Sequence, residues 1–363
     1  MFLKLALFLF WPILQGAPPQ QYIELSKFWK AASVIETGMT RPLAVITCPS
    51  KDSVSDGWLI AADSSGKLAE YFSDGNSWTA KRSFTAGTPL LCICAAAPKP
   101  DMEFHLYGGT KTGQIIEVSR GVMGWSKHEI VQLPGPIKTI FATEAGGGGI
   151  PSVLFVIDGN GKIYQLIPPD NATDPAARWT TLAFTDVPGG ASLIVAHRYG
   201  QKLWAAAAGT KGDIYRYTRD SLGIWHTDPW AKMAAGPKYF AAAVDPSLRD
   251  IAVYYAGNDG LFRFLFLGYT EDKKARVPVA DGASNILGGG TQRRFNEFFG
   301  ISNNEFCMFE FNFDDKAWHK VPIDKIEPPV VSTNFGFGLN DLVAQMYVMG
   351  ANGKIHQFVR YKN

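Results

Sequence analysis

The sequence has few charged residues, few cysteines and no long apolar run, and each shortage excludes a class of protein. Its 363 residues include 35 basic and 33 acidic side chains, which nearly cancel. A nucleic-acid-binding protein needs a clustered basic surface, and no long run of Lys and Arg occurs here. Charged residues make up only 19% of the chain, whereas 46% is hydrophobic. That much apolar content excludes a disordered protein.

The longest apolar run is too short to cross a membrane. It covers residues 5–14, follows Lys4 and leads to small residues at Gly16 and Ala17. A membrane-spanning helix needs about 20 apolar residues, whereas a secretory signal peptide has this arrangement of charge, apolar run and small residues. We therefore expect residues 1–16 to be a signal peptide, the protein to be secreted, and the mature chain not to be inserted in a membrane.

The four cysteines are Cys48, Cys92, Cys94 and Cys307, and all lie in apolar, strand-like runs. In such runs a free Cys behaves as a small hydrophobic residue, so we expect unpaired thiols although a secreted chain could form two disulfides. No His lies at ligand spacing from a Cys, which argues against a zinc site, and no cofactor is expected. Asn171 begins a glycosylation sequon in a polar stretch, as suits a secreted glycoprotein.

A repeat of 44 to 51 residues runs through the chain. Each copy has an apolar run, a turn rich in Gly, Asn and Asp, and a second apolar run, which is typical of a β-hairpin because Gly and Asn tolerate the positive φ that such turns require. The seven turn residues are Gly66, Gly113, Gly161, Gly212, Gly260, Asn304 and Gly353.

Two more strands are predicted in each copy. A run rich in small residues precedes each hairpin, and Pro opens several of these runs, as it does at the first residue of a strand. A fourth strand follows, usually opened by Trp. The residues in that place are Trp78, Trp125, Trp179, Trp225 or Trp230, the stretch Lys274–Val277, and Trp318. Four short strands per repeat predict an all-β, seven-bladed β-propeller.

The predicted propeller is one domain covering residues 20–363, and its two ends share a blade. The seventh repeat is one strand short, and residues 28–38 are similar in kind to residues 77–87, which form the fourth strand of the first repeat. An N-terminal strand that completes the last blade would leave no unpaired break in the ring. The expected repeats cover residues 39–87, 88–134, 135–188, 189–235, 236–281, 282–327, and 328–363 with 22–38.

Two positions in each repeat stand out, eight residues before the turn residue and four after it. We expect them to face each other across the hairpin, on one side of the blade. The pairs are Trp58/Glu70, His105/Glu117, Val153/Gln165, Trp204/Arg216, Ala252/Phe264, Asn296/Met308 and Gln345/Gln357. Because polar groups buried between blades are costly without partners, these pairs either satisfy one another or line a solvent-filled pocket.

Two stretches, YYAGNDGLFR at residues 254–263 and DGNSW at residues 74–78, resemble the repeat of the fungal fucose-specific lectins and their seven-bladed bacterial relatives. The resemblance implies a propeller with sugar pockets between blades and glycans, fucosylated ones among them, as partners. In that family an Arg that clamps the sugar lies eight residues before the turn Gly, and a Glu lies four after it. No copy here has Arg at the first position. The second position is matched by Glu70 and Glu117, and loosely by Gln165 and Gln357.

These features favour a non-enzymatic, lectin-like protein that binds carbohydrate between blades, where Trp would stack on the sugar and polar side chains would bind its hydroxyls. The candidate residues are Trp58, Glu70, His105 and Glu117, followed by Trp204, Arg216, Gln345 and Gln357. Two alternatives stay open. A secreted hydrolase or lyase would gather titratable residues from several blades on the central axis. A protein-interaction scaffold would have an exposed apolar patch and apolar gaps between blades.

Overall fold

The computed structural model describes most of the chain from residue 29 to residue 360. Not described within this range are residues 50–55, 75–76, 97–103, 122–123, 144–152, 170–177, 185–186, 200–201, 220–223, 233–236, 246–249, 258–261, 268–282, 292–293, 303–304, 313–316, 326–328 and 338–343. The described part consists of strands and turns, and within it no helix is long and apolar enough to cross a membrane.

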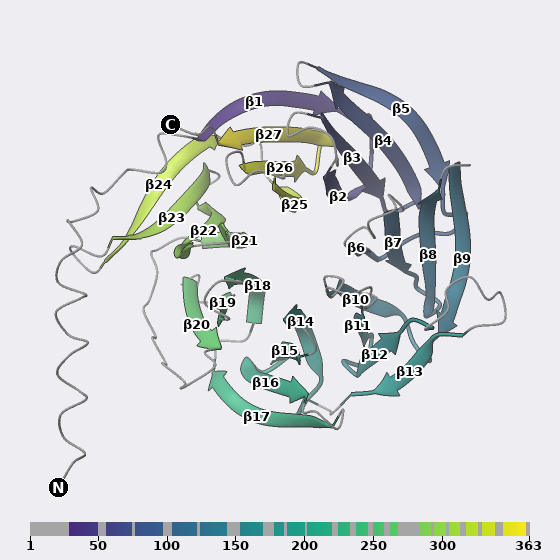
Figure 1. Cartoon of the computed structure of the whole chain (residues 1–363), viewed down its shortest axis with the longest axis vertical. Helices are drawn as coiled ribbons and strands as arrows, with labels where there is room; N and C mark the ends of the chain where they lie inside the picture. Colours follow the sequence, from purple (N-terminus) through teal and green to yellow (C-terminus); the bar gives the residue numbers. More distant parts are fainter. Residues whose placement is uncertain are drawn as a thin grey trace, which may run out of the picture.

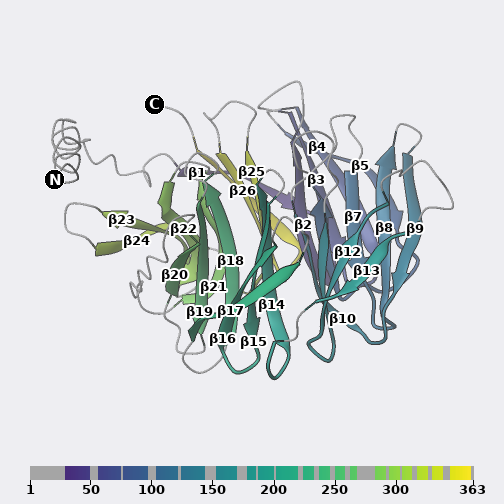
Figure 2. The ribbon, with the colours of Figure 1, turned by 60° about the horizontal axis from the view of Figure 1, so that its bottom comes forward.

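Seven antiparallel sheets are arranged in a ring, as a seven-bladed β-propeller requires (Figure 1). In six of the sheets the first strand lies nearest the centre, and in the seventh the N-terminal strand lies outermost. The innermost strands of neighbouring blades contact each other all the way round. Figure 2 shows the same ring turned by 60°. The innermost strands are β2, β6, β10, β14, β18, β21 and β25, and they include the runs rich in small residues that precede each hairpin.

The blades are numbered in chain order. Blade 1 contains β2 (Pro42–Pro49), β3 (Asp56–Asp63), β4 (Lys67–Asp74) and β5 (Trp78–Thr85), and blade 2 contains β6 (Cys92–Ala96), β7 (Phe104–Gly109), β8 (Gln114–Gly121) and β9 (Gly124–Gln132). Blade 3 contains β10 (Ile137–Ala142), β11 (Leu154–Asp158), β12 (Ile163–Ile167) and β13 (Thr180–Ala183), and blade 4 contains β14 (Ala191–Tyr199), β15 (Lys202–Gly209), β16 (Asp213–Arg219) and β17 (Trp225–Lys232).

The remaining blades complete the ring. Blade 5 contains β18 (Pro237–Asp245), β19 (Asp250–Gly257) and β20 (Phe262–Leu267), and blade 6 contains β21 (Ala283–Thr291), β22 (Arg294–Ser302), β23 (Glu305–Asn312) and β24 (Ala317–Lys325). Blade 7 contains β25 (Val330–Phe337), β26 (Ala344–Gly350), β27 (Lys354–Arg360) and the N-terminal β1 (Trp29–Glu36). The stretch Lys274–Val277, expected in place of a fourth strand in blade 5, lies outside the described residues.

The N-terminal strand pairs with the C-terminal one, as predicted. Strand β1 runs antiparallel to β27, with Trp29 opposite Arg360 and Glu36 opposite Lys354 (Figure 1). Ile35 is buried against blade 1, together with Met39 in the connection to that blade. The two ends of the chain therefore form one sheet, and that sheet packs against the next.

Five of the predicted turn glycines have the positive φ that was expected of them, and packing supplies a second reason for Gly; the five are Gly66, Gly113, Gly161, Gly212 and Gly353. The other two predicted turn residues, Gly260 and Asn304, lie outside the described residues. Gly66 has a φ of 88°. A Cβ on Gly66 would lie 2.3 Å from the carbonyl oxygen of Thr88, in the connection to blade 2. In the same turn, the carbonyl oxygen of Gly66 accepts a hydrogen bond from the amide of Ala86 at 2.8 Å. The turn at Gly66 therefore fastens its hairpin to the connection between blades 1 and 2.

The core lies between neighbouring blades. Between blades 1 and 2, buried side chains of β3 and β4 pack against those of β7 and β8; among them are Ile60, Leu68, Leu106, Ile116 and Val118. Similar clusters lie between blades 2 and 3, 3 and 4, and 7 and 1. Burying a side chain of this size contributes about 1.5–3 kcal/mol, so each junction stabilises the ring.

Three of the cysteines are free, as expected: Cys92 and Cys94 are half-buried and Cys307 is buried. Burial raises the pKa of the Cys92 thiol to about 12, so it stays protonated and unreactive. Cys48 lies in β2, and its side chain is not described. The predicted signal peptide, residues 1–16, and the sequon at Asn171 lie outside the described residues, and both stay predictions.

Deletion of residues 20–38 removes β1 and opens the seam between the two ends of the chain. We expect a large loss of stability, because β27 loses its partner strand and the face of blade 1 loses Ile35. Thermal unfolding followed by circular dichroism measures this against a chain that begins at residue 20. A truncated protein that melts cooperatively at an unchanged temperature would contradict the role of β1.

A pair of point variants on β1 separates packing from pairing. Ile35 is 5% exposed and Val34 is 53% exposed, although the two are neighbours. Ile35→Ala should cost about 2–4 kcal/mol of unfolding free energy, since it removes buried methyl groups, whereas Val34→Ala should cost less than about 0.5 kcal/mol. Equal losses would mean that β1 does not pack on blade 1.

Candidate functional site

One hydrogen bond recurs between neighbouring blades. A Trp at the start of an outer strand donates its indole N–H to the Glu or Gln that lies four residues after the turn Gly of the preceding blade. The three cases are Trp78 to Gln357 at 3.0 Å, Trp125 to Glu70 at 3.1 Å and Trp225 to Gln165 at 3.0 Å. We call this contact the inter-blade indole bond.

The inter-blade indole bond explains why two sequence positions have their residue types. Gln165 is fully buried and Glu70 nearly so, and a buried polar group without a partner costs about 1–3 kcal/mol. The partner comes from the next blade, where the Trp ring also fills apolar space. These Glu and Gln side chains therefore have a structural role.

Gln357 has the same role at the seam of the ring. Its Oε1 accepts the Trp78 indole N–H and, at 2.6 Å, the hydroxyl of Ser33 on β1. Its Nε2 donates to the hydroxyl of Tyr347 at 3.3 Å. One amide thus joins the N-terminal strand, the C-terminal hairpin and blade 1, and its contacts favour the reading in which these polar groups satisfy one another.

The junction of blades 1 and 2 carries a cation as well. The Nε atom of Arg120, on β8, lies 2.9 Å from Oε1 of Glu70, on β4. The Glu70 side chain is 2% exposed and that of Arg120 is 25% exposed. The guanidinium lies over the ring of Trp58, 4.3 Å from its centroid. We call Trp58, Glu70, Arg120 and Trp125 the junction cluster.

Aromatic rings surround the junction cluster on both blades. Phe72 is tilted against Trp58 with ring centroids 4.9 Å apart, and Phe84 stacks on Trp125 at 6.2 Å. Cation–π contact and the carboxylate both restrain the guanidinium of Arg120. Within the described residues its Nη1 and Nη2 atoms have no partner. The cluster therefore contains a partly exposed Arg120 side chain, with its guanidinium already oriented, beside aromatic rings.

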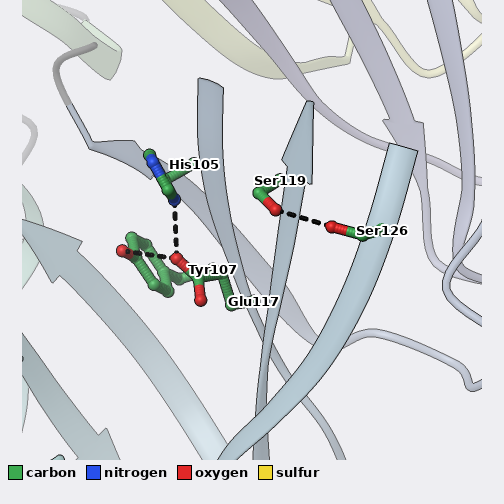
Figure 3. A network of polar contacts seen from close by, with 5 residues as sticks. All are labelled: His105, Tyr107, Glu117, Ser119 and Ser126. Atoms are coloured by element: carbon green, nitrogen blue, oxygen red, sulfur yellow. Dashed lines mark hydrogen bonds and ion pairs between the residues drawn. The ribbon is translucent and has the colours of Figure 1, made fainter. Parts of the chain in front are cut away.

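The junction of blades 2 and 3 carries a different polar group. The Nδ1 atom of His105, on β7, lies 2.6 Å from Oε1 of Glu117, on β8, and the hydroxyl of Tyr107 donates to the same oxygen at 3.1 Å (Figure 3). Burial opposes ionisation of Glu117, but His105, Tyr107 and the charge of His128 outweigh it and lower the pKa of Glu117. Burial and the neighbouring carboxylate raise the pKa of Tyr107.

The His105–Glu117 pair is half-buried at its junction. Both side chains are 17% exposed, and the ring of Trp179 from blade 3 lies edge-on to Tyr107 at 5.6 Å. On the same strand, Ser119 instead bonds to Ser126 of β9 (Figure 3). The carboxylate of Glu117 is thus satisfied within its own blade.

The other candidate residues do not form one site with these. Arg216, in blade 4, pairs within its own blade with Asp228 at 3.1 Å. Trp204 lies on β15, opposite His197 and Thr218. Gln345 lies on β26, and its side chain is not described. The structure thus brings Trp58 and Glu70 to one junction and His105 and Glu117 to another.

The predicted facing of the paired positions is wrong by two residues in six blades, and by three in blade 6, where Met308 lies opposite Phe299. Blade 1 illustrates the shift by two. Trp58 lies opposite Phe72, and Glu70 lies opposite Ile60. In the structure, the midpoint between paired residues of β3 and β4 is Ser65. The positions eight residues before and four residues after Gly66 have their midpoint at Ser64, one residue too early. A shift by an even number keeps both residues on one face of the sheet, so Trp58 and Glu70 are diagonal neighbours.

Sequence reasoning missed Arg120, because it looked for each Arg in the same blade as its Glu. Arg120 lies seven residues after its turn Gly and opposite Trp125, and Arg219 has the equivalent place in blade 4, opposite Trp225. Comparing positions between successive repeats, rather than within one, would have found it.

No group of three or more His, Cys, Asp and Glu suited to a metal ion occurs in the part of the chain that the structure describes.

No family model matches the sequence, and no curated protein matches it. Several solved structures are similar in fold. BBS1N, solved in complex with ARL6DN, has 15% sequence identity and a TM-score of 0.62, covering 92% of this chain and 97% of its own. The β-propeller domain of Cps50 (Swd1) from Myceliophteria thermophila has 11% identity and a TM-score of 0.59, covering 91% and 99%. The SapL1 lectin, in complex with alpha methyl fucoside, has 14% identity and a TM-score of 0.52, covering 80% and 98%. These similarities show a propeller fold.

The inter-blade indole bond can be measured with two Trp variants. Trp125 donates to a buried carboxylate, whereas Trp179, in the next blade, makes no such bond among the described residues. Trp125→Phe should lower the free energy of unfolding by about 2 kcal/mol more than Trp179→Phe, since a hydrogen bond to a charged group contributes about 1.5–3 kcal/mol. Urea unfolding measures both. Equal losses would show that only ring packing matters.

Proposed function

We propose that the protein binds carbohydrate without catalysis, at the junction cluster between blades 1 and 2. The observation that carries the proposal is the position of Arg120. The resemblance to propeller lectins calls for an Arg and a Glu together between blades, and no repeat has that Arg in its own hairpin. Arg120 of the next blade lies 2.9 Å from Glu70 and supplies the missing group.

The chemistry of the junction cluster suits a sugar. Sugar rings are bound through apolar C–H faces on aromatic side chains and through hydroxyls on fixed polar groups. Trp125 and Phe84 supply aromatic surface, and Arg120 supplies donors. Arg120 covers one face of Trp58, so we assign Trp58 the task of orienting the guanidinium, in place of the stacking role expected from the sequence. Glu70 holds both Arg120 and Trp125.

The similarity in fold to the SapL1 lectin supports the proposal. Because one fold can host many functions, the ligand is argued from the residues of the junction cluster. BBS1N, which has the higher TM-score, was solved with a protein partner. A protein-interaction scaffold predicts apolar gaps between blades, whereas the first two junctions contain Glu70 with Arg120 and His105 with Glu117. These charged groups favour a small polar ligand. On the sequence features described above, we also propose secretion and glycosylation at Asn171.

Arg120→Lys tests the proposal with little risk to the fold. The variant keeps a positive charge near Glu70 but loses the planar guanidinium with its several donors. Sugar affinity should fall about tenfold, the equivalent of one charge-assisted hydrogen bond. Titration calorimetry, with sugars selected on a glycan array that includes fucosides, measures this change.

Arg219→Lys is the matched control, because Arg219 has the equivalent place in blade 4 but faces a junction with Gln165 in place of Glu70. It should leave the affinity unchanged. If Arg120→Lys and Arg219→Lys lower the sugar affinity equally, or if neither lowers it, the sugar binds at a site other than the junction cluster. A protein that binds no sugar on the array would remove the proposal.

A further inference from the structure

Positive charge gathers at the junction of blades 1 and 2 beyond what Glu70 can neutralise. Arg82, on β5, is the cross-strand neighbour of Glu70 and is exposed. Lys127, on β9, is exposed in the blade opposite. Among the described residues neither is in an ion pair. With Arg120, three cations lie on β5, β8 and β9 at this junction, and they outnumber the buried carboxylate of Glu70 and the exposed Glu129, two residues after Lys127.

Two of these cations lie close to the opposite blade. A Cβ built on Gly124, beside Trp125 in blade 2, would lie 3.9 Å from Nη1 of Arg82 in blade 1. A Cβ built on Gly87, which follows β5, would lie 3.8 Å from Nζ of Lys127 in blade 2. Arg82 and Lys127 therefore each extend across the junction toward a glycine of the opposite blade, and these small residues leave room for the long side chains.

Arg120 adds direction to this charge. Its Nε is held by Glu70, and its plane is held by Trp58. The remaining edge of the guanidinium, Nη1 and Nη2, can donate two parallel hydrogen bonds, the geometry that carboxylate, sulfate and phosphate oxygens accept. A neutral hydroxyl uses one of these donors, whereas an oxyanion uses both and also offsets the charge of Arg82 and Lys127.

We infer that the ligand of the junction cluster is an acidic saccharide, whose carboxylate or sulfate binds the Nη edge of Arg120 with Arg82 and Lys127 beside it. This inference rests on the proposed function and narrows its ligand class. The aromatic rings of Trp125 and Phe84 favour a sugar over an acidic peptide, because a sugar ring has an apolar face to lay against them.

The experiment compares three oligosaccharides of equal length by titration calorimetry with the full-length protein. One is a sulfated heparin tetrasaccharide, one is an oligogalacturonate that carries carboxylates only, and one is neutral chitotetraose. A poly-glutamate peptide is the fourth probe. We expect at least one acidic saccharide to bind about tenfold or more tightly than chitotetraose, and its affinity to fall as salt is raised from about 50 to 200 mM, because exposed charges are screened. A preference for the heparin tetrasaccharide would indicate that sulfate is recognised, and a preference for the oligogalacturonate would indicate carboxylate.

Single-charge variants locate the binding. Arg82→Gln and Lys127→Gln should each weaken the acidic saccharide several-fold, up to about tenfold, and leave the melting temperature unchanged. Lys211→Gln is the control, since Lys211 is an exposed cation in the turn between β15 and β16 of blade 4, and it should have no effect. Equal losses in all three variants would mean that net charge alone attracts the ligand, which overturns the inference.

The remaining outcomes separate this inference from the proposed function. Chitotetraose or another neutral sugar that binds as tightly as the acidic ones overturns the inference and leaves carbohydrate binding intact. Poly-glutamate that binds as tightly as the acidic saccharides overturns it too, because the site would then recognise charge without a sugar. If none of the saccharides binds and the glycan array is also blank, both fail.

Discussion

A polar side chain buried between two blades must find its hydrogen-bond partner on the next blade, and this constraint organises the ring. The Glu or Gln four residues after the turn Gly lies where the hairpins pack together, and Glu70 and Gln165 are buried there. Leaving it unsatisfied would cost about as much as a buried side chain contributes. The Trp of the following outer strand donates a hydrogen bond to its carboxylate or amide oxygen in three junctions. The blades are thus joined by directional contacts as well as by apolar packing, which has no direction.

The same constraint joins the two ends of the chain. Gln357 accepts hydrogen bonds from Ser33 on the first strand and from Trp78 on the first complete blade. Without strand β1, that amide oxygen would lose one donor and β27 would become a free edge. A free edge exposes unpaired backbone groups and invites aggregation. The shared blade therefore pairs β27 with an outer strand, as in the other four-stranded blades, and holds both ends of the chain in one sheet.

The sequence was sufficient for the fold and insufficient for the site, for separate physical reasons. Turn glycines and strand periodicity act locally, so Gly66 and its equivalents mark each hairpin, and the missing strand of the last repeat indicates the pairing of the two ends. Contacts between blades join residues about fifty positions apart in the sequence, and they depend on the direction in which each side chain points. The cation beside Glu70 is Arg120, in the next repeat, and a count centred one residue too early in the hairpin misplaced Trp58 opposite Glu70. Trp125, expected only to open a strand, also donates a hydrogen bond to Oε2 of Glu70.

Glu70 connects the structural role of the junction to its proposed function, because one carboxylate holds both the indole of the next blade and the guanidinium that faces solvent. The most direct test is a crystal structure of the protein with its tightest-binding oligosaccharide. The account predicts sugar oxygens on the Nη atoms of Arg120, with the contacts from Glu70 to Arg120 and Trp125 unchanged. A sugar bound on the central axis, or at a junction without Arg120, would contradict it.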